Sequence, residues 1–394
     1  MITNDFLGNQ VSRLGFGAMR LPVRADKSVD PVKTQEMVDY AIAHGVNYFD
    51  TAWPYHSGTS ELVLGECLKK YDRDSFFLAN KFPGHQVMSE YKPAEIFEKQ
   101  LEKCQVEYFD YYLLHNVCES SLPNYLDERW GIVDYFVKQK ELGRIKHLGL
   151  SSHARTENLA AILDRWSEIL EFCQIQCNYL DWTLQDAKGK YDLLTERGIP
   201  IIVMEPLRGG KLCSLGGQHM EKLNALRPGM TPTAWALQFL KDLPNVAVTL
   251  SGMSTPEQMA ENVAIYEGGV VLSEQERGIL FSIAESMKNA LPCTACRYCT
   301  EGCPMELDIP MLIAAYNDMK FTGGGFTVGM QMDALPAEKL PSACIGCGAC
   351  AAICPQQIDI PAAMEAFTSL LASTPSWADI CREREEAARK LAGK

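Results

Sequence analysis

The chain has 394 residues, 37 basic and 50 acidic side chains, and a formal net charge of −13. This acidic balance disfavours nucleic acid and anionic membranes as partners, because both would repel it. No apolar run reaches the ~18 residues that a membrane-spanning helix needs, and the first residues lack a charged-then-apolar export signal. We therefore expect a cytoplasmic protein of two or three domains, with no membrane or nucleic-acid partner.

Up to residue 290, short apolar segments alternate with amphipathic ones. We predict strands at 14–19, 46–50, 76–81, 110–115, 147–151, 172–176, 199–204 and 246–250. We predict helices at 31–44, 59–70, 93–104, 129–142, 156–166, 185–197, 232–241 and 256–266, with an extra helix at 274–289. Eight alternating pairs of this kind predict a (β/α)8 TIM barrel of class α/β.

A doubly wound open sheet is the alternative to the barrel. Such a sheet needs a glycine-rich phosphate loop between its first strand and first helix. Gly15 and Gly17 lie inside the first strand instead, and Arg20, Leu21 and Pro22 follow without opening a helix. The barrel is therefore the favoured interpretation.

The 15 cysteines fall into distinct groups. Six stand singly before residue 290, and Cys381 stands alone near the end of the chain. The single cysteines of the first region are Cys67, Cys104, Cys118, Cys173, Cys177 and Cys213. We expect these to be buried apolar fillers, with Cys118 also a candidate for lining a binding site. The remaining eight form two tight runs, which in a cytosolic chain indicate metal or redox chemistry.

Each cysteine run has the spacing C-x2-C-x2-C-x3-C-P, and the second repeats the first 51 residues later. This spacing is typical of [4Fe–4S] clusters, in which the fourth cysteine serves the other cluster. The expected ligands of one cluster are Cys293, Cys296, Cys299 and Cys354. Those of the other are Cys344, Cys347, Cys350 and Cys303. Structural zinc is the alternative, but it usually pairs two C-x2-C units across a long spacer.

The cysteine runs define a second region of different texture. We divide the chain into a barrel at 1–285 and a mainly helical, ferredoxin-like two-cluster domain at 286–394. In the latter we expect a helix at 310–320, a glycine-rich loop at 323–325 and a charged helix at 378–392. The clusters either transfer electrons or only hold this domain together. Because each oxidised cluster adds roughly −2 of charge, a redox protein partner should present a basic face.

Polar residues follow the second, third and fourth predicted strands. Asp50 and Tyr55 follow the second, Lys81 ends the third, and His115 ends the fourth. With the segments 45–52, 80–81 and 114–116, this pattern resembles the aldo-keto reductase family over roughly residues 1–285. Barrel strands meet at their carboxyl ends, where the active sites of such barrels lie. The four residues are therefore our candidate catalytic group.

Reduction of a carbonyl needs a hydride on carbon and a proton on oxygen. The resemblance implies that Tyr55 donates the proton, that Lys81 lowers the pKa of this tyrosine, and that Asp50 holds the lysine. It also implies that His115 orients the carbonyl. Singly, each residue also fits a structural role. Trp53, His56 and Trp182 are candidates for contacting substrate or for packing, and 116–128 is long enough to form a lid.

The resemblance also implies contacts with a nicotinamide cofactor, NAD(P)H. Ser151, Ser152 and Gln174 match the residues that hold the nicotinamide amide, and Pro206, Leu207 and Gly209 match the loop over the pyrophosphate. The segment around the adenosine end is matched by Gly252, Ser254, Gln258, Glu261 and Asn262. Met204 stands where many members have a stacking tyrosine. Gly252 and Gln258 stand where NADP-preferring members carry cations for the 2′-phosphate, which argues against NADP preference unless Arg208 or Lys211 substitutes.

Two functions from different classes remain open. The first is an oxidoreductase that moves hydride between a nicotinamide and a carbonyl or alcohol substrate, while two [4Fe–4S] clusters relay electrons to a partner. This arrangement also resembles bacterial and archaeal reductases with a fused iron–sulfur domain. The second is an iron–sulfur electron-transfer or scaffold protein whose barrel has little carbonyl reductase activity. A flavin in place of the nicotinamide is a third, minor option.

Overall fold

A computed structural model describes residues 1–394 except 87, 216, 288–290, 323–325 and 375–394. Contacts divide the chain into two compact units, Met1–Ala284 and Glu285–Lys394. Each unit is described below by itself. The predicted charged helix at 378–392, Cys381, the glycine-rich loop at 323–325 and the end of the predicted helix 274–289 lie outside the described residues.

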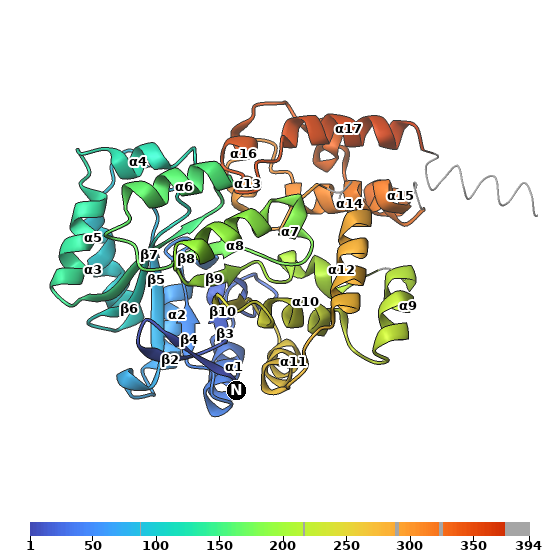
Figure 1. Ribbon diagram of the computed structural model, residues 1–394. Coiled ribbons are helices and arrows are strands. Elements are labelled where there is room, and N and C mark those ends of the chain that lie inside the picture. Colours follow the sequence, from blue (N-terminus) through green and yellow to red (C-terminus); the bar gives the residue numbers. More distant parts are fainter. Residues whose placement is uncertain (87, 216, 288–290, 323–325, 375–394) are drawn as a thin grey trace, which may run out of the picture. The chain divides into compact units, whose positions relative to one another are not determined.

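The first unit is built around eight parallel strands that close into a barrel in the order β10-β3-β4-β5-β6-β7-β8-β9. Figure 1 shows these strands inside a layer of helices. The strands are β3 Leu14–Gly17, β4 Tyr48–Asp50, β5 Phe77–Phe82, β6 Phe109–Leu114, β7 Ile145–Ser152, β8 Cys173–Gln176, β9 Ile201–Met204 and β10 Val246–Ser251. Each coincides with one predicted strand, so the (β/α)8 barrel is confirmed and the open sheet is wrong.

All eight predicted barrel helices are present. They are α1 Pro31–Ala43, α2 Ser60–Leu68, α3 Pro93–Cys104, α5 Ile132–Glu141, α6 Thr156–Arg165, α8 Ala187–Glu196, α10 Pro232–Lys241 and α11 Pro256–Glu267. Several begin as their sequences dictate: Thr231 and Thr255 accept a backbone N–H of the following turn, and proline fills the first helical position. The predicted extra helix is α12, Glu274–Met287.

Short elements between the barrel segments were not predicted. They are α4 Leu122–Leu126, α7 Asp181–Leu184, α9 Gly217–Leu226, and the 3-10 turns η1 Ala18–Arg20, η2 Tyr55–Gly58, η3 Arg73–Ser75 and η4 Arg208–Cys213. Most are a single turn, too short to show a helical period in the sequence. Three of them, η1, η2 and η4, lie just after barrel strands, where the candidate site is built.

A β-hairpin before the barrel was also not predicted. Its strands are β1 Thr3–Phe6 and β2 Asn9–Ser12, joined through Leu7 and Gly8, both of positive φ. The fully buried Phe6 ring stacks on Tyr111 of β6 at 4.8 Å and meets Phe172 edge-on. The hairpin therefore supplies a hydrophobic side chain to the barrel interior.

Gly15 of the first barrel strand serves packing between strands. A Cβ atom there would come within 2.7 Å of the Leu250 and Val248 side chains of β10. Gly15 has no Cβ, so the side chains of β10 can lie close to its backbone. Its role is therefore structural and not that of a phosphate loop. This agrees with the exclusion of the open sheet.

The second unit is helical over its described residues. Its elements are α13 Tyr298–Glu301, α14 Ile309–Thr322, α15 Phe326–Asp333, η5 Ala337–Lys339, η6 Pro341–Ala343, α16 Ala349–Ala352 and α17 Ile360–Ala372. The predicted helix 310–320 is α14. The core includes Leu312, Ile313, Ile360, Met364 and Phe367, all nearly inaccessible to solvent.

The 51-residue sequence repeat is also a structural repeat. Helix α13 corresponds to α16, and α14 begins 51 residues before α17. Positive φ angles recur at the same spacing, in the pairs Ala295 and Gly346, Arg297 and Gly348, and Glu306 and Gln357. In each half an aspartate, Asp308 or Asp359, accepts a backbone N–H at the start of the following helix. Both halves therefore fold the cysteine run in the same way.

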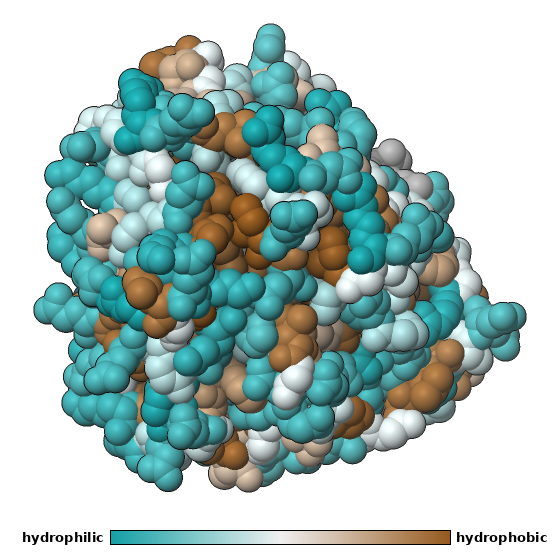
Figure 2. Space-filling model, turned by 60° about the vertical axis from the view of Figure 1, so that its left-hand side comes forward, coloured by the Kyte–Doolittle hydropathy of each residue, from teal (hydrophilic) through white to brown (hydrophobic). Residues whose placement is uncertain are grey.

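The exposed surface is mostly hydrophilic on the face that Figure 2 shows, with apolar side chains in smaller areas between polar ones. The large exposed hydrophobic residues lie on different elements, Val32 on α1, Leu142 after α5 and Ile345 in the second cysteine run among them. Among the described residues, no helix is long and apolar enough to cross a membrane.

Candidate active site and iron–sulfur sites

The four candidate catalytic residues come together at the carboxyl ends of neighbouring strands. Asp50 ends β4, Lys81 lies in β5 beside it, and His115 directly follows β6. Tyr55 lies in η2, five residues after Asp50. At most 8% of the surface of each residue is exposed. The sequence spacing thus produces one buried polar group at this end of the barrel.

Lys81 is the centre of this group. Its Nζ donates to Asp50 Oδ1 at 2.5 Å, to the Thr51 carbonyl at 2.8 Å and to Tyr55 Oη at 3.3 Å. Burial lowers the pKa of Lys81 and raises that of Asp50, while their mutual attraction opposes both shifts. The pair therefore places a cation next to the tyrosine oxygen in a site shielded from water.

A strained backbone follows Tyr55. His56 and Ser57 both adopt left-handed conformations, with φ of 50° and 53°. The His56 Nε2 accepts a hydrogen bond from the Leu21 N–H at 3.0 Å, which fixes this turn to the segment after η1. Non-glycine residues in such conformations cost of order 1–3 kcal/mol each and occur often at functional sites. The strain here coincides with the residue that resembles the proton donor.

His115 is an uncharged imidazole. Burial lowers its pKa well below the usual range, and the neighbouring His85, Lys81 and His153 lower it further. The His115 ring lies edge-on to Tyr55, with 6.0 Å between ring centroids. Its backbone carbonyl accepts a hydrogen bond from the buried Tyr125 of α4 at 2.7 Å. The ring is therefore positioned beside the tyrosine and carries no charge near neutral pH.

A second buried layer, which the sequence did not predict, holds the strand ends that carry the four candidate residues. Glu61 of α2 accepts hydrogen bonds from Asn80, Gln100 and Lys103, each at 2.9 Å. Gln100 also donates to the Lys81 carbonyl at 3.0 Å. Asn80, a polar residue directly before Lys81, was a sign of this layer in the sequence. Its hydrogen-bond partners lie on α2 and α3, and no sequence pattern shows that these two helices meet at Asn80.

The remaining candidates for substrate contact make other interactions. The Trp53 ring lies 4.0 Å from Lys103 Nζ, and the Trp182 ring packs against Tyr191 and Phe239. Segment 116–128 contains α4, whose Tyr125 is buried as described above. Cys118 is buried with its thiol near Ser120 and Ser121. These contacts are those of packed side chains.

The prediction for the single cysteines is wrong at one position. Cys67, Cys104, Cys173 and Cys177 are buried, as expected, but Cys213 is exposed. It ends η4, a turn after a barrel strand that was not predicted.

Two predicted nicotinamide contacts, Ser151 and Gln174, lie on adjacent strands in direct register. The Ser151 hydroxyl accepts from the Asn116 N–H at 2.8 Å, and its own proton remains to be donated. Gln174 Oε1 is buried without a partner among the described residues. An amide ligand that accepts from Ser151 and donates to Gln174 fits both groups. Ser152 differs, because its hydroxyl donates to the Val117 carbonyl and accepts from Ala154.

The predicted pyrophosphate segment follows β9. Pro206 and Leu207 lead into η4, where Arg208, Gly209 and Gly210 all have positive φ. Arg208 is fully buried and paired with Asp181 at 3.0 Å. This pair uses the Arg208 Nε, whereas its two terminal nitrogens are buried without a partner among the described residues.

The predicted adenosine segment surrounds the start of α11. The Ser254 hydroxyl donates to the Arg20 carbonyl, and the Ser254 backbone N–H donates to Gln258 Oε1. Glu261 accepts from Thr231 at 2.6 Å. Asn262 donates to Ser251, and its buried Oδ1 has no partner among the described residues. Asn262 Oδ1 could accept a hydrogen bond from an N–H group of a ligand, whereas Ser254 and Gln258 are hydrogen-bonded to each other.

Gly252 lies at the base of this segment against Arg20. A Cβ at Gly252 would meet the aliphatic part of that side chain at 3.2 Å. The Arg20 guanidinium lies 3.7 Å from Glu205. Arg20, the cation that lies against Gly252, is thus already paired with the Glu205 carboxylate.

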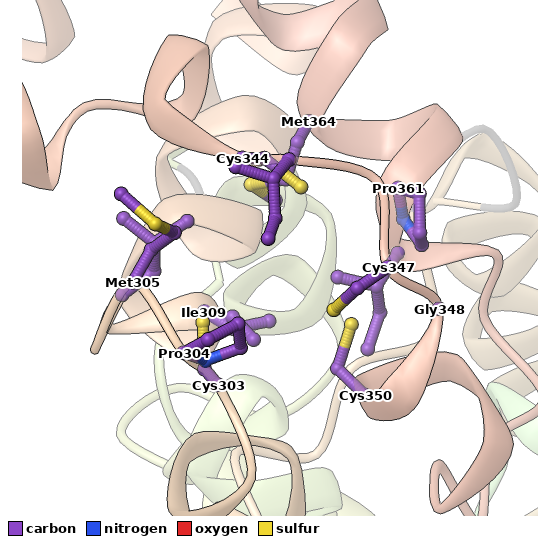
Figure 3. A pocket seen from close by; sticks show the side chains of 13 residues that line it. Cys303, Pro304, Met305, Ile309, Cys344, Cys347, Gly348, Cys350, Pro361 and Met364 are labelled. Carbon is purple, nitrogen blue, oxygen red and sulfur yellow. The ribbon is translucent and has the colours of Figure 1, made fainter.

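The eight clustered cysteines separate into two sets of four, each crossing between the runs. Cys303 joins Cys344, Cys347 and Cys350 around one cavity of about 350 Å³, part of it open to solvent (Figure 3). Cys354 joins Cys293, Cys296 and Cys299 around another of about 310 Å³. These are the two sets that the spacing predicts for crossed ligation.

The chemistry of both sets fits an iron–sulfur cluster. Apolar side chains line the cavities, Ile360 both of them. Burial raises the pKa of the Cys299, Cys350 and Cys354 thiols, so that bound iron must supply the stabilisation of the thiolates. The Ala295 N–H points to Cys293 Sγ at 3.4 Å, the kind of backbone bond that tunes a cluster.

Fold and site together define a barrel oxidoreductase that carries an iron–sulfur domain. The barrel residues 13–285 match the model of the aldo/keto reductase family, and residues 292–358 match that of a 4Fe-4S dicluster domain. The chain belongs to the aldo/keto reductase family. The match to the second model supports two [4Fe–4S] clusters in the C-terminal unit.

Curated relatives cover the barrel. "Probable aldo-keto reductase 1" of Glycine max is 30% identical over 216 residues, which are 52% of this chain and 58% of that protein. "L-galactose dehydrogenase" of Arabidopsis thaliana is 27% identical over 65% of this chain and 85% of its own length. "NADH-specific methylglyoxal reductase" of Escherichia coli is 24% identical over 62% and 85%.

Solved structures agree in fold. An aldo-keto reductase of Klebsiella pneumoniae in complex with NADPH is 21% identical, with a TM-score of 0.58 over 72% of this chain and 96% of that one. The aldo-keto reductase AKR11C1 from Bacillus halodurans in its holo form is 24% identical, with a TM-score of 0.56 over 70% and 93%. These likenesses confirm the (β/α)8 fold of the barrel unit.

Proposed function

We propose that the barrel moves hydride between NAD(P)H and a small carbonyl or alcohol substrate, with Asp50, Tyr55, Lys81 and His115 as its catalytic residues. The observation that carries the proposal is the buried Lys81 ammonium, which contacts both Asp50 and Tyr55 Oη. The family membership and the crossed cysteine sets are consistent with a redox enzyme.

The proton transfer follows from this geometry. In the reducing direction Tyr55 Oη gives its proton to the carbonyl oxygen, and the adjacent ammonium of Lys81 stabilises the phenolate left behind. Asp50 keeps the lysine in place. The uncharged His115 donates a hydrogen bond that orients the carbonyl without competing as an acid. In the oxidising direction the same groups take the proton from the alcohol.

The cofactor contacts are a part of the same proposal. Ser151 and Gln174 would hold the carboxamide of a nicotinamide, which supplies the hydride when bound, and the turn at Leu207 and Gly209 would face its phosphates. Asn262 would accept from the adenine. NADH is the expected partner, because Gly252 and Gln258, which stand at the family's 2′-phosphate positions, are uncharged.

We further propose that oxidation of NADH to NAD+ and a proton can instead deliver its two electrons to the clusters, one to each, and that the clusters pass them singly to a redox partner with a basic face. The net charge of −13 before cluster assembly favours such a partner by attraction. The scaffold alternative keeps the clusters but lacks this flow of electrons. Anaerobic protein with both clusters should therefore reduce a one-electron dye with NADH, and a preparation that binds NADH without any dye reduction would reject the relay.

Anaerobic calorimetry tests the cofactor assignment. NADH should bind the full-length protein at least tenfold more tightly than NADPH. Gln174→Met should weaken NADH binding by about tenfold, the effect of one lost hydrogen bond of about 1.4 kcal/mol. Gln35→Met, on the outer helix α1, is the matched control and should bind as the unaltered protein does. Tighter binding of NADPH, or no effect at Gln174, would contradict the assignment.

A further inference from the structure

Three histidines lie at the carboxyl ends of three consecutive strands. His85 lies three residues after β5, His115 directly follows β6, and His153 directly follows β7. The rings of His85 and His115 are in edge contact, with 4.3 Å between their centroids. His153 influences the pKa of His115, and His85 that of His153. We call these three residues the imidazole cluster; only His115 belongs to the catalytic group above.

The imidazole cluster is uncharged near neutral pH. Burial lowers the pKa of His85 to about 4 and that of His153 to about 3, and it lowers the pKa of His115 as well. The charged groups facing the cluster act in the same direction, Lys81 on His85 and His115, and Lys190 on His153. Each neutral ring therefore carries one N–H and one unprotonated nitrogen, and the His85 ring is already hydrogen-bonded to the His115 backbone.

Two ring nitrogens of the imidazole cluster lack a hydrogen-bond partner among the described residues. The Nδ1 atoms of His115 and His153 are buried, and neither has a hydrogen bond with the described residues. Buried polar atoms in native proteins are nearly always satisfied. The His115 ring lies edge-on to Tyr55, the proposed proton donor, so a bound substrate is a natural partner for these atoms.

The chemistry of neutral imidazoles selects among substrates. A hydroxyl group both donates and accepts, so it can pair with either nitrogen of a neutral ring. A carboxylate or phosphate only accepts and needs a cation when buried. The nearby Lys81 is already bound to Asp50 and to the Thr51 carbonyl. A metal ion is the other common partner of three histidines, but the described part of the imidazole cluster forms no group that could hold a single metal ion.

We propose that His85 and His153 are specificity-determining residues that, with His115, select uncharged, hydroxyl-bearing carbonyl or alcohol substrates. The proposal rests on the carbonyl reduction proposed above and names the class of substrate for it. Hydroxyls next to the reacting carbon bind the cluster, whereas purely aliphatic or anionic chains of the same length do not.

Three aldehydes of similar size test the proposal on the anaerobic, full-length protein with its clusters. They are glyceraldehyde with two hydroxyls, butanal with none, and succinic semialdehyde with a carboxylate. Glyceraldehyde should have a kcat/KM at least tenfold above that of either other compound. In His153→Leu this preference over butanal should shrink about tenfold, and His153→Gln, which keeps an amide donor and acceptor, should restore part of it.

The preference is a ratio, so a fraction of misfolded variant does not alter it. His44→Leu is the matched control, since His44 caps α1 before β4, at the other ends of the strands, and its preference should equal that of the unaltered protein. Equal kcat/KM for glyceraldehyde and butanal, a preference for succinic semialdehyde, or an unchanged ratio in His153→Leu would each overturn the proposal. Loss of turnover with every aldehyde, also in the unaltered protein, would overturn the proposed function itself.

Discussion

Lys81 has no exposed surface in its side chain, yet it carries the charge around which the site is arranged. Three oxygens surround its ammonium, from Asp50, Thr51 and Tyr55. A buried ion pair is no better for stability than apolar packing, but breaking one is costly. We infer that the pair exists for its effect on Tyr55 and not for the stability of the barrel.

Removal of one partner of the buried Asp50–Lys81 pair should destabilise the protein. In Asp50→Asn the buried ammonium loses its counter-charge, so the free energy of unfolding should fall by about 3 kcal/mol. The pKa of Lys81 should fall further, and carbonyl reduction should decline with it. Urea denaturation measures the stability, with Asp192→Asn in the exposed pair with Lys188 as the control, expected within about 0.5 kcal/mol of the unaltered protein. Equal losses in both variants would contradict the account.

The lowered pKa values of the imidazole cluster should make the free energy of unfolding depend on pH. The folded-state pKa values of its three histidines lie below the usual value of about 6.5, so the unfolded chain takes up protons first as the pH falls. Stability from this source is complete above about pH 6.5 and declines below it, by about 2 kcal/mol per histidine between pH 7 and pH 5.

Denaturation followed by the tryptophan signal at both pH values checks this. His153→Gln should reduce the decline by about 2 kcal/mol, because one titrating group is gone. His44→Gln should leave it unchanged. A decline that is the same in all three proteins would show that these histidines do not titrate as described.

At the residue scale the sequence was sufficient for the groups that belong to strand ends. Asp50, Lys81 and His115 could be placed together because parallel barrel strands end at one face. The Glu61 layer could not, because its hydrogen bonds join α2, β5 and α3 through side chains with no fixed spacing. Burial, which makes the imidazole cluster neutral, is likewise a property of the folded chain alone.

At the scale of elements, regular periodicity decided what could be predicted. Every barrel strand carried a short apolar run and its helix an amphipathic pattern, and α3 and α10 begin and end where the sequence indicates. The β1–β2 hairpin was missed because its strands, TNDF and NQVS, are mostly polar and carry no apolar run, although Gly8 in its turn was a usable signal. Turns such as η4 form through positive φ angles and local hydrogen bonds, which leave no period.

The repeated turns of the cysteine runs allow a matched pair of substitutions. Gly346 has a φ of +68° and open space around a Cβ, so Gly346→Ala should cost about 1 kcal/mol through conformation alone. Ala295, its counterpart, already bears this strain at a φ of 53°. Ala295→Gly should therefore be neutral or slightly stabilising, as relief of strain offsets the flexibility of the unfolded chain.

Anaerobic urea unfolding, followed by the visible absorption of the clusters, measures both variants. The prediction fails if Ala295→Gly and Gly346→Ala change stability in the same direction by the same amount. That result would mean that the two halves do not wrap their cysteines in equivalent turns.

At the scale of the whole molecule, the chain combines two units with different sources of stability. The barrel has an extensive hydrophobic interior, with Phe6, Tyr111 and Phe172 among its fully buried rings. The second unit has a small core beside eight thiols that would repel one another as thiolates without iron. Folding of the second unit should therefore depend on its clusters, while that of the barrel should not.

Removal of iron by an anaerobic chelator tests this difference. Helical circular dichroism should decrease as the second unit unfolds. The near-ultraviolet signal of the tryptophans should persist, because those that the structure describes, such as Trp166 and Trp235, lie in the barrel. Simultaneous loss of both signals would show that the barrel needs the clusters to fold.

We propose that Tyr55, Lys81, Asp50 and His115 together promote hydride transfer from a nicotinamide to a carbonyl. The most direct measurement uses NADH deuterated at C4, a hydroxyaldehyde and the anaerobic full-length protein, with mass spectrometry of the alcohol formed. The unaltered protein should place one deuterium on the carbinol carbon, and Tyr55→Phe should form at least a hundredfold less product while still binding NADH. Product without deuterium, or equal turnover in Tyr55→Phe, would contradict the claim.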